Sequence, residues 1–289
     1  MSMFASLPAW LVIAAAGVLG LLVGSFLNVV ILRLPARLMH GWRRDAREVL
    51  ELPPDETDIA PPGIVRQASH CPHCKHPLAA HDNIPLFSWL LLRGRCRHCK
   101  APISIQYPLV ESITGILSAL VVWRFGPGWT AFAALLFTWT LIAASGIDLR
   151  TQLLPDQLTL PLQWLGLLLA LVPLFVDLRA AVMGAAIGYL ALWSVYWIFK
   201  LLTGKEGMGY GDFKLLAALG AWMGPLALLP IVLLSSLLGA IVGIIALRAR
   251  GKDHSTPIPF GPFLATAGWV WFVFGHDLFA AYLHVSGLR

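Results

Sequence analysis

Two aspartates stand at the edges of long apolar runs, Asp148 within LIAASGIDLRTQLLPDQ and Asp212 within GMGYGDFKLL. Carboxylates are rare beside hydrocarbon because the ionised form loses its hydration there. Two neighbouring carboxylates can share one water: the ionised one takes a proton from it, and the protonated one donates to a scissile carbonyl oxygen. The chain has no GxSxG or HExxH pattern that would suggest another hydrolytic site. The two residues are therefore candidates for an aspartyl hydrolase pair, although each alone could equally cap a helix or lie at a membrane interface.

Three glycines alternate with other residues directly before Asp212, in GMGYG. Glycine has no Cβ, so another backbone can come close to it. This segment could therefore pair with an extended substrate. It is a poor candidate for a nucleotide loop, because an apolar run follows it and no Rossmann-type strand and helix surround it.

All four cysteines lie in two short motifs, CPHC and CRHC, which contain Cys71, Cys74, Cys96 and Cys99. Two CxxC motifs at this separation suit a tetrahedral zinc site, because each motif offers two thiolates to one ion. Two disulfides, or a redox-active CxxC, are the alternatives, and they would suit an oxidising compartment. Four thiolates leave no open position for water or substrate, so the sequence predicts a structural zinc ion.

The composition is that of a polytopic membrane protein. The 289 residues are 58% hydrophobic and only 12% charged, with a mean hydropathy of +0.74. Crossing the hydrocarbon core requires roughly 20 apolar residues in a helix. A run at 213–224 is short, and could be a tilted span, a half-helix or a re-entrant segment. The longer runs predict spans at 8–32, 107–123, 129–147, 158–176, 180–202, 226–247 and 260–283.

Basic residues support a count of about eight spans. If the short run crosses, most of the 21 lysines and arginines fall on one side, which is then the cytoplasmic side. The basic pI near 9.4 then reflects membrane topology and requires no nucleic-acid partner. We therefore expect an all-α membrane protein with a first transmembrane helix at 1–32, a small cytoplasmic zinc-ribbon-like insert at 33–106, and the catalytic transmembrane helices at 107–289.

Four further polar residues lie next to the predicted spans. Asp156 follows a proline at the start of a span, which predicts a helix cap. Lys214 is expected to extend its amine to the membrane interface. Asn28 is expected to join two helices by hydrogen bonds. Glu111, inside a span, either supports the aspartate site or satisfies a packing partner.

The motifs GSFLNVVILRLP, CPHC, NIPLFSWLLLRGRCRHC, YPLVE, DLRTQLLPDQLTLP and GMGYGDFKLLAALGAWMG resemble those of the type IV prepilin peptidases. These are bacterial leader peptidases that also act as N-methyltransferases and belong to the GxGD aspartyl proteases. The resemblance covers the chain from about residue 20 to about residue 265. It implies that Asp148 and Asp212 are the catalytic pair, and that the four cysteines hold the metal.

The resemblance also implies the reaction and its location. It implies cleavage of type IV prepilins and pseudopilins after a glycine, at the cytoplasmic face of the bacterial inner membrane. It further implies methylation of the new N-terminal residue, often Phe, with S-adenosylmethionine as donor; the insert near Gly94 is where we would expect the donor to bind. The alternatives are an intramembrane aspartyl peptidase with other substrates, a membrane transporter, and a zinc-ribbon scaffold without catalytic activity.

Overall fold

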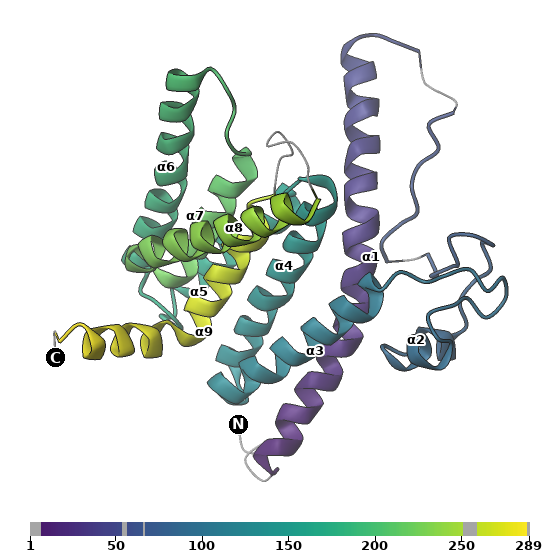
Figure 1. Ribbon diagram of the computed structural model, residues 1–289, viewed down its shortest axis with the longest axis horizontal. Helices are drawn as coiled ribbons and strands as arrows, with labels where there is room; N and C mark the ends of the chain where they lie inside the picture. The colour runs from purple at the N-terminus through teal and green to yellow at the C-terminus, as the bar shows by residue number, and fades with distance from the viewer. Residues whose placement is uncertain (1–6, 54–56, 66, 251–258, 288–289) are drawn as a thin grey trace. The chain divides into compact units, whose positions relative to one another are not determined.

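The described part of the chain is built from helices. The computed structural model describes all residues except 1–6, 54–56, 66, 251–258 and 288–289 (Figure 1). Its only β pairing in that part consists of two isolated bridges, so the all-α prediction is confirmed. The longer helices are α1 (Ala9–Val49), α3 (Gln106–Phe125), α4 (Trp129–Thr151), α5 (Asp156–Leu169), α6 (Leu178–Thr203), α7 (Tyr210–Met223), α8 (Leu228–Arg250) and α9 (Gly261–Val285). The short ones are η1 (Ala80–Asn83), α2 (Phe87–Leu91) and η2 (Pro225–Ala227).

Six of the described helices are long and apolar enough to cross a membrane: α1, α3, α4, α6, α9, and the stretch that includes η2 and most of α8. The chain is therefore a multi-pass membrane protein. Helices α5 and α7 complete the expected eight, but each has only 14 residues. At 1.5 Å per residue such a helix covers about 21 Å, which is short of the hydrocarbon thickness. The span predicted at 158–176 therefore ends early, at Leu169, and the run predicted at 213–224 begins earlier, at Tyr210.

The chain divides into two compact units. The first ends at Ala143, and the second begins at Ala144. In the first unit, α1 packs along α3. A Cβ added to Gly20 would lie 2.5 Å from Ser118 Oγ, and one added to Gly24 would lie 2.7 Å from the Glu111 backbone. Small residues at these positions let the two helices approach closely, as in other membrane helix pairs.

Helix α1 also carries the polar contact expected at this interface. Asn28 Nδ2 donates to Gly24 O on its own helix and to Tyr107 O on α3, at 3.3 and 3.1 Å, as predicted. After the predicted span, α1 continues without interruption to Val49, through Pro35. The charged residues that follow the first predicted span, up to Val49, therefore form the outer part of the same helix.

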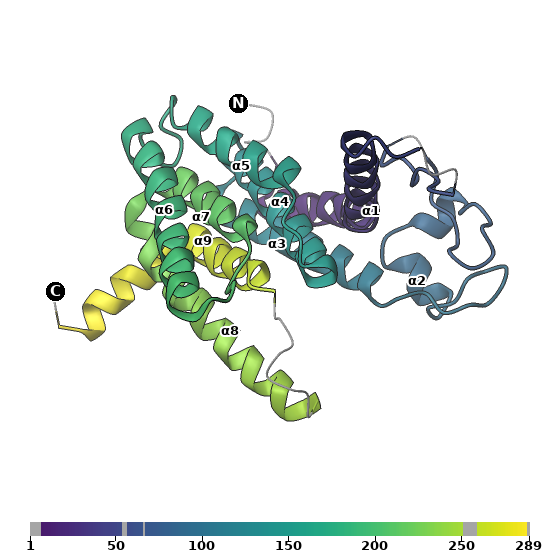
Figure 2. The same ribbon diagram turned by 90° about the horizontal axis from the view of Figure 1, so that it is seen from above.

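Helix α7 forms the core of the second unit. It packs against α5, α6 and α9, and Figure 2 shows it beside α6 and α9. Its backbone touches that of α6, because a Cβ added to either Gly184 or Gly220 would overlap the carbonyl of the other. Every residue from Leu215 to Trp222 is buried. Protein neighbours therefore surround this short helix, which removes the need for it to match the membrane thickness.

Candidate active site and metal centre

The two candidate aspartates lie at helix ends in the second unit. Asp148 is in the last turn of α4, and Asp212 is in the first turn of α7. Their exposed fractions are only 5% and 6%. The carboxylates are close enough to interact electrostatically. The fold therefore brings together two residues that are far apart in the sequence and buries both.

Gly261, the first residue of α9, fixes the Asp148 carboxylate. Its backbone N–H donates to Asp148 Oδ2 at 3.0 Å. A Cβ at Gly261 would lie 2.6 Å from the same oxygen and 3.0 Å from Leu154 Cδ1. The absence of a side chain is therefore what allows α9 to begin directly against the carboxylate. Sequence reasoning missed this residue, and the only signal was a glycine before a proline at the start of an apolar run.

Leu154 packs close to both aspartates, against one glycine beside each of them. Its side chain borders Gly261, and its Cβ would be 2.6 Å from a Cβ added to Gly211, the residue before Asp212. Leu154 belongs to the short connection between α4 and α5. This apolar side chain therefore packs on both sides against glycines next to the aspartates.

The backbone before Asp212 is open. Gly209 precedes α7 in an extended conformation, and its carbonyl accepts from Asp212 N–H at 3.2 Å. A Cβ added to Gly209 would meet nothing closer than 4.0 Å, where its neighbours are Asp212 Oδ2 and Gly211 N. Gly207, Gly209 and Tyr210 are all exposed. An extended peptide thus has room to lie against Gly209, next to a buried carboxylate, whereas a side chain at Gly207 or Gly211 would collide with the protein itself.

An ion pair near the site corrects one prediction and adds a contact to another. Asp156 is the first residue of α5, and the N-cap position before it is occupied by Pro155. Its carboxylate instead accepts from Lys214 Nζ at 2.6 and 2.8 Å. The helix-cap prediction for Asp156 was therefore wrong, and Lys214 contacts a carboxylate instead of only extending to the interface. The pair connects the start of α5 to the first turn of α7.

The four cysteines form one cluster in the first unit. Their sulfur atoms all lie within 4.8 Å of one another, and Cys71 Sγ is 3.8 Å from Cys99 Sγ. Thiolates around a tetrahedral zinc ion at about 2.3 Å would be about 3.8 Å apart. None of the four is in a disulfide. The cluster thus fits a metal ion, and the disulfide alternative has no support.

The two CxxC motifs have the same backbone geometry. Cys71 N–H donates to His76 O and Cys96 N–H to Ala101 O, at 2.9 and 2.8 Å. Hydrogen bonds from the backbone of Cys74, and then of His73, lower the pKa of the Cys71 thiol to about 6, although burial opposes them. This lowered pKa favours the thiolate that a metal requires.

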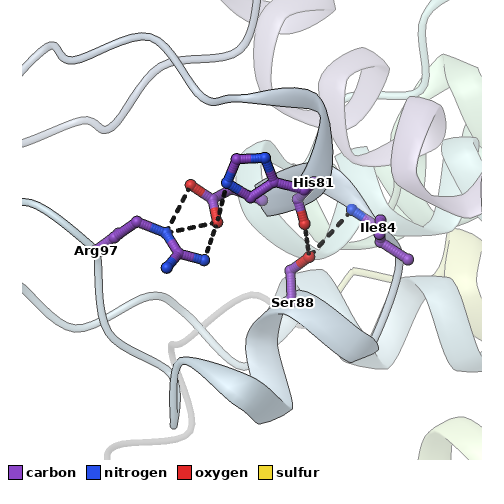
Figure 3. Close-up of polar contacts among 5 residues, drawn as sticks. His81, Ile84, Ser88 and Arg97 are labelled. Carbon is purple, nitrogen blue, oxygen red and sulfur yellow. Dashed lines mark hydrogen bonds and ion pairs between the residues drawn. The ribbon is translucent and has the colours of Figure 1, made fainter.

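Contacts outside the cluster hold the insert in shape (Figure 3). Arg97, between the second pair of cysteines, donates to Asp82 at 2.7 and 2.9 Å. These bonds hold the pKa of Asp82 below its usual range. Ser88 Oγ donates to His81 O at 2.7 Å and accepts from Ile84 N at 3.1 Å. The second cysteine pair is thereby joined to η1, and η1 to α2.

Glu111 attaches the insert to a membrane helix. It is buried in α3, and its Oε2 accepts from the backbone N–H of Leu86 at 2.8 Å. Leu86 has a positive φ of 62° and directly precedes α2. Of the two roles considered for Glu111, these contacts support the structural one.

The fold and the site together fit one class of protein: multi-pass membrane aspartic peptidases that carry a cysteine-rich insert. Comparison with known families supports this class. The Bacterial Peptidase A24 N-terminal domain matches residues 18–125, and the Type IV leader peptidase family matches residues 135–244.

Curated proteins match over nearly the whole chain. A protein of Xanthomonas campestris pv. campestris is 61% identical over 276 residues, which cover 96% of each chain. One of Stutzerimonas stutzeri is 56% identical, over 96% of this chain and 95% of its own. One of Pseudomonas aeruginosa is 54% identical, over 94% and 93%. All three are named prepilin leader peptidase/N-methyltransferase.

The chain belongs to the type IV leader peptidase family, which is a family of aspartic peptidases. No solved structure matches it significantly.

Proposed function

We propose that the chain cleaves the leader peptide from type IV prepilins and pseudopilins and then methylates the new N-terminal residue. The family and the names of the similar proteins support this activity. The single observation that carries the hydrolytic part is the buried pair Asp148 and Asp212, next to the open backbone at Gly209.

In the proposed mechanism, one water lies between the two carboxylates. Asp148 accepts a hydrogen bond from Gly261 N–H, which favours its ionised form, so Asp148 takes a proton from the water. Asp212 donates its proton to the scissile carbonyl oxygen as the water oxygen attacks the carbon. The C–N bond of the tetrahedral intermediate then breaks. Asp148 gives its proton to the departing amine, and Asp212 regains the proton of the former carbonyl oxygen.

The substrate geometry follows from the position of the site. Asp148 and Asp212 lie at the ends of apolar helices, so the scissile bond must be at a membrane face. We assign this face to the cytoplasmic side of the bacterial inner membrane, because basic residues accumulate on that side of the predicted topology. Cleavage after a glycine in a short leader would leave the apolar pilin segment in the bilayer.

The second activity requires a methyl donor, and the proposed donor is S-adenosylmethionine. When bound, it supplies the methyl group that the new N-terminal amine receives. The insert around Gly94 is the proposed place for it. The proposed metal in the cysteine cluster is zinc, whose four thiolate ligands would leave it a structural role.

Two isosteric substitutions test the catalytic pair. Asn has nearly the shape of Asp but can neither ionise nor donate a carboxylic proton, so Asp148→Asn and Asp212→Asn should each abolish prepilin cleavage by purified protein. The double variant should be no worse than either single one, because groups acting on one water fail as a unit. Asp177→Asn is the matched control, since Asp177 caps α6 by accepting from Ala180 N–H at 2.9 Å.

The control variant should cleave at close to the wild-type rate, because Asn also caps helices well. A folded Asp148→Asn or Asp212→Asn protein that cleaves prepilin near the wild-type rate would refute the assignment. The same assay separates the proposed peptidase from a transporter or a scaffold, neither of which would shorten the substrate.

A further inference from the structure

Helix α2 exposes large apolar side chains in the middle of a polar insert. The exposed fractions of Phe87, Leu90 and Leu91 are 64%, 64% and 80%. Ser88, on the other face, is buried and bonded to His81 and Ile84. The apolar residues therefore cannot turn inward without breaking the contacts that hold the helix. Contiguous exposed apolar side chains of this kind indicate a surface that something covers.

Three cations lie in the segment that follows this helix. Arg93, Arg95 and Lys100 line a hollow of about 470 Å³ together with Leu92 and Cys96. In the part of the chain that the structure describes, none of the three cations has a carboxylate within ion-pair distance. Nearby Arg97 differs, because it is bonded to Asp82. The hollow is therefore positively charged and suited to an anionic group such as a phosphate.

The position of α2 relative to a membrane span is fixed by one hydrogen bond. Leu86, directly before α2, donates to Glu111 on α3. Glu111 is the sixth residue of α3, a candidate span that begins at Gln106. At 1.5 Å per residue, the bond lies about 7.5 Å inside this helix from its start. Helix α2 is thus held beside the first turns of a span, where the lipid headgroups are expected.

We propose that Phe87, Leu90, Leu91, Arg93, Arg95 and Lys100 form a membrane-docking surface, which binds the anionic surface of the bilayer that contains the chain. The apolar side chains enter the boundary between headgroups and acyl chains, as those of interfacial helices do. The cations contact lipid phosphates. The insert is thereby held against the membrane by this surface, in addition to the bond from Leu86 to Glu111 and its covalent links to α1 and α3. This inference does not depend on the proposed function.

A photo-crosslinking experiment on the full chain tests the surface. A benzoylphenylalanine placed at Leu91 is compared with one at Ile59, whose exposed fraction of 84% is similar. Ile59 is the matched control because it lies next to a part of the chain that is expected outside the membrane. Its neighbour Asp58 pairs with His40 and Arg43, which belong to the part of α1 beyond the predicted span. The protein is placed in nanodiscs of phosphatidylcholine alone, or of phosphatidylcholine mixed with phosphatidylglycerol. Lipid adducts are then measured by mass spectrometry.

Lipid adducts are expected at Leu91 and not at Ile59, and their yield at Leu91 should rise with phosphatidylglycerol. The variant Arg93→Gln/Arg95→Gln/Lys100→Gln should lose this rise, because each cation near an anionic surface contributes roughly fivefold to binding. If the triple variant loses its bound metal, Arg93→Gln alone should still reduce the rise. Equal lipid labelling at the two positions would overturn the proposal. Yields at Leu91 that do not change with phosphatidylglycerol would also overturn it. The same holds for adducts at Leu91 with a second protein chain in place of lipid.

Discussion

Replacing Gly261 with alanine perturbs the proposed site without removing any polar group. The backbone N–H that donates to Asp148 Oδ2 at 3.0 Å is kept. The new Cβ, however, would lie 2.6 Å from that oxygen and 3.0 Å from Leu154 Cδ1. Ordinary contact begins at 3.4 Å, so the carboxylate and the helix must separate by roughly 0.8 Å. A misplacement of about 1 Å can reduce an enzymatic rate by about 10²-fold.

We therefore expect kcat for prepilin cleavage to fall between about tenfold and 10²-fold in Gly261→Ala. The assay is a time course of leader removal by purified, reconstituted enzyme at saturating prepilin, with KM measured in parallel. Because the shift acts on the carboxylate, the loss should be in kcat more than in KM. The matched control is Gly239→Ala in α8, whose new Cβ would meet Phe263 at an ordinary 3.4 Å.

Loss of folding could produce the same result, so the melting temperature of each variant is required. Overpacking typically costs about 1–3 kcal/mol, which should lower the melting temperature without unfolding the protein at the assay temperature. Gly211→Ala provides a second way to displace groups of the site. Its new Cβ would be 2.6 Å from Leu154 Cβ and would push the Leu154 side chain against the site. A folded Gly261→Ala enzyme that keeps kcat within about twofold of wild type would refute the role given to this contact.

Three further outcomes are expected. Purified protein should contain about one zinc per chain, measured by elemental analysis, and Cys71→Ser should contain less; isolation of two stable disulfides would contradict this. Asp148→Asn should still methylate a pilin supplied already cleaved, measured by transfer of labelled methyl, whereas loss of methylation in folded protein would indicate one shared pocket. Asp156→Asn and Lys214→Met should each lower kcat for cleavage no more than a few-fold, because a partly exposed ion pair contributes only about 0.2–1 kcal/mol to folding stability. The exchanged pair Asp156→Lys/Lys214→Asp should recover part of that loss, and no recovery would mean that the two residues act separately.

Several features of the protein could be read from the sequence because their causes are local. Apolar runs of sufficient length form membrane helices whatever surrounds them, since the backbone must satisfy its own hydrogen bonds in lipid. The cysteine cluster was predictable for a similar reason: each CxxC motif turns on itself, as the bonds from Cys71 N–H to His76 O and from Cys96 N–H to Ala101 O show. The pairing of Asp148 with Asp212 was expected from their positions at the edges of apolar runs and from the family resemblance.

Other features depended on contacts between distant residues. Whether α1 stops after its span or continues to Val49 depends on what its polar half contacts: Arg33, for example, donates to the backbone carbonyls of Gly63 and Gln67. The early end of α5 at Leu169 is likewise not visible in the apolar run, which continues beyond it. Hydropathy measures solvent preference, so it does not distinguish an apolar residue in a helix from one in the following turn.

The surroundings of the aspartates were decided by the tertiary structure alone. Gly261 binds Asp148 across 113 residues of sequence, and Lys214 binds Asp156 across 58. A glycine at a helix start, a carboxylate after a proline and a lysine near an interface each have several common local roles. Which role applies is set by the group that packing brings within hydrogen-bond distance. A sequence pattern records the residues along one segment, whereas these contacts join segments that meet only when α4, α5, α7 and α9 pack together.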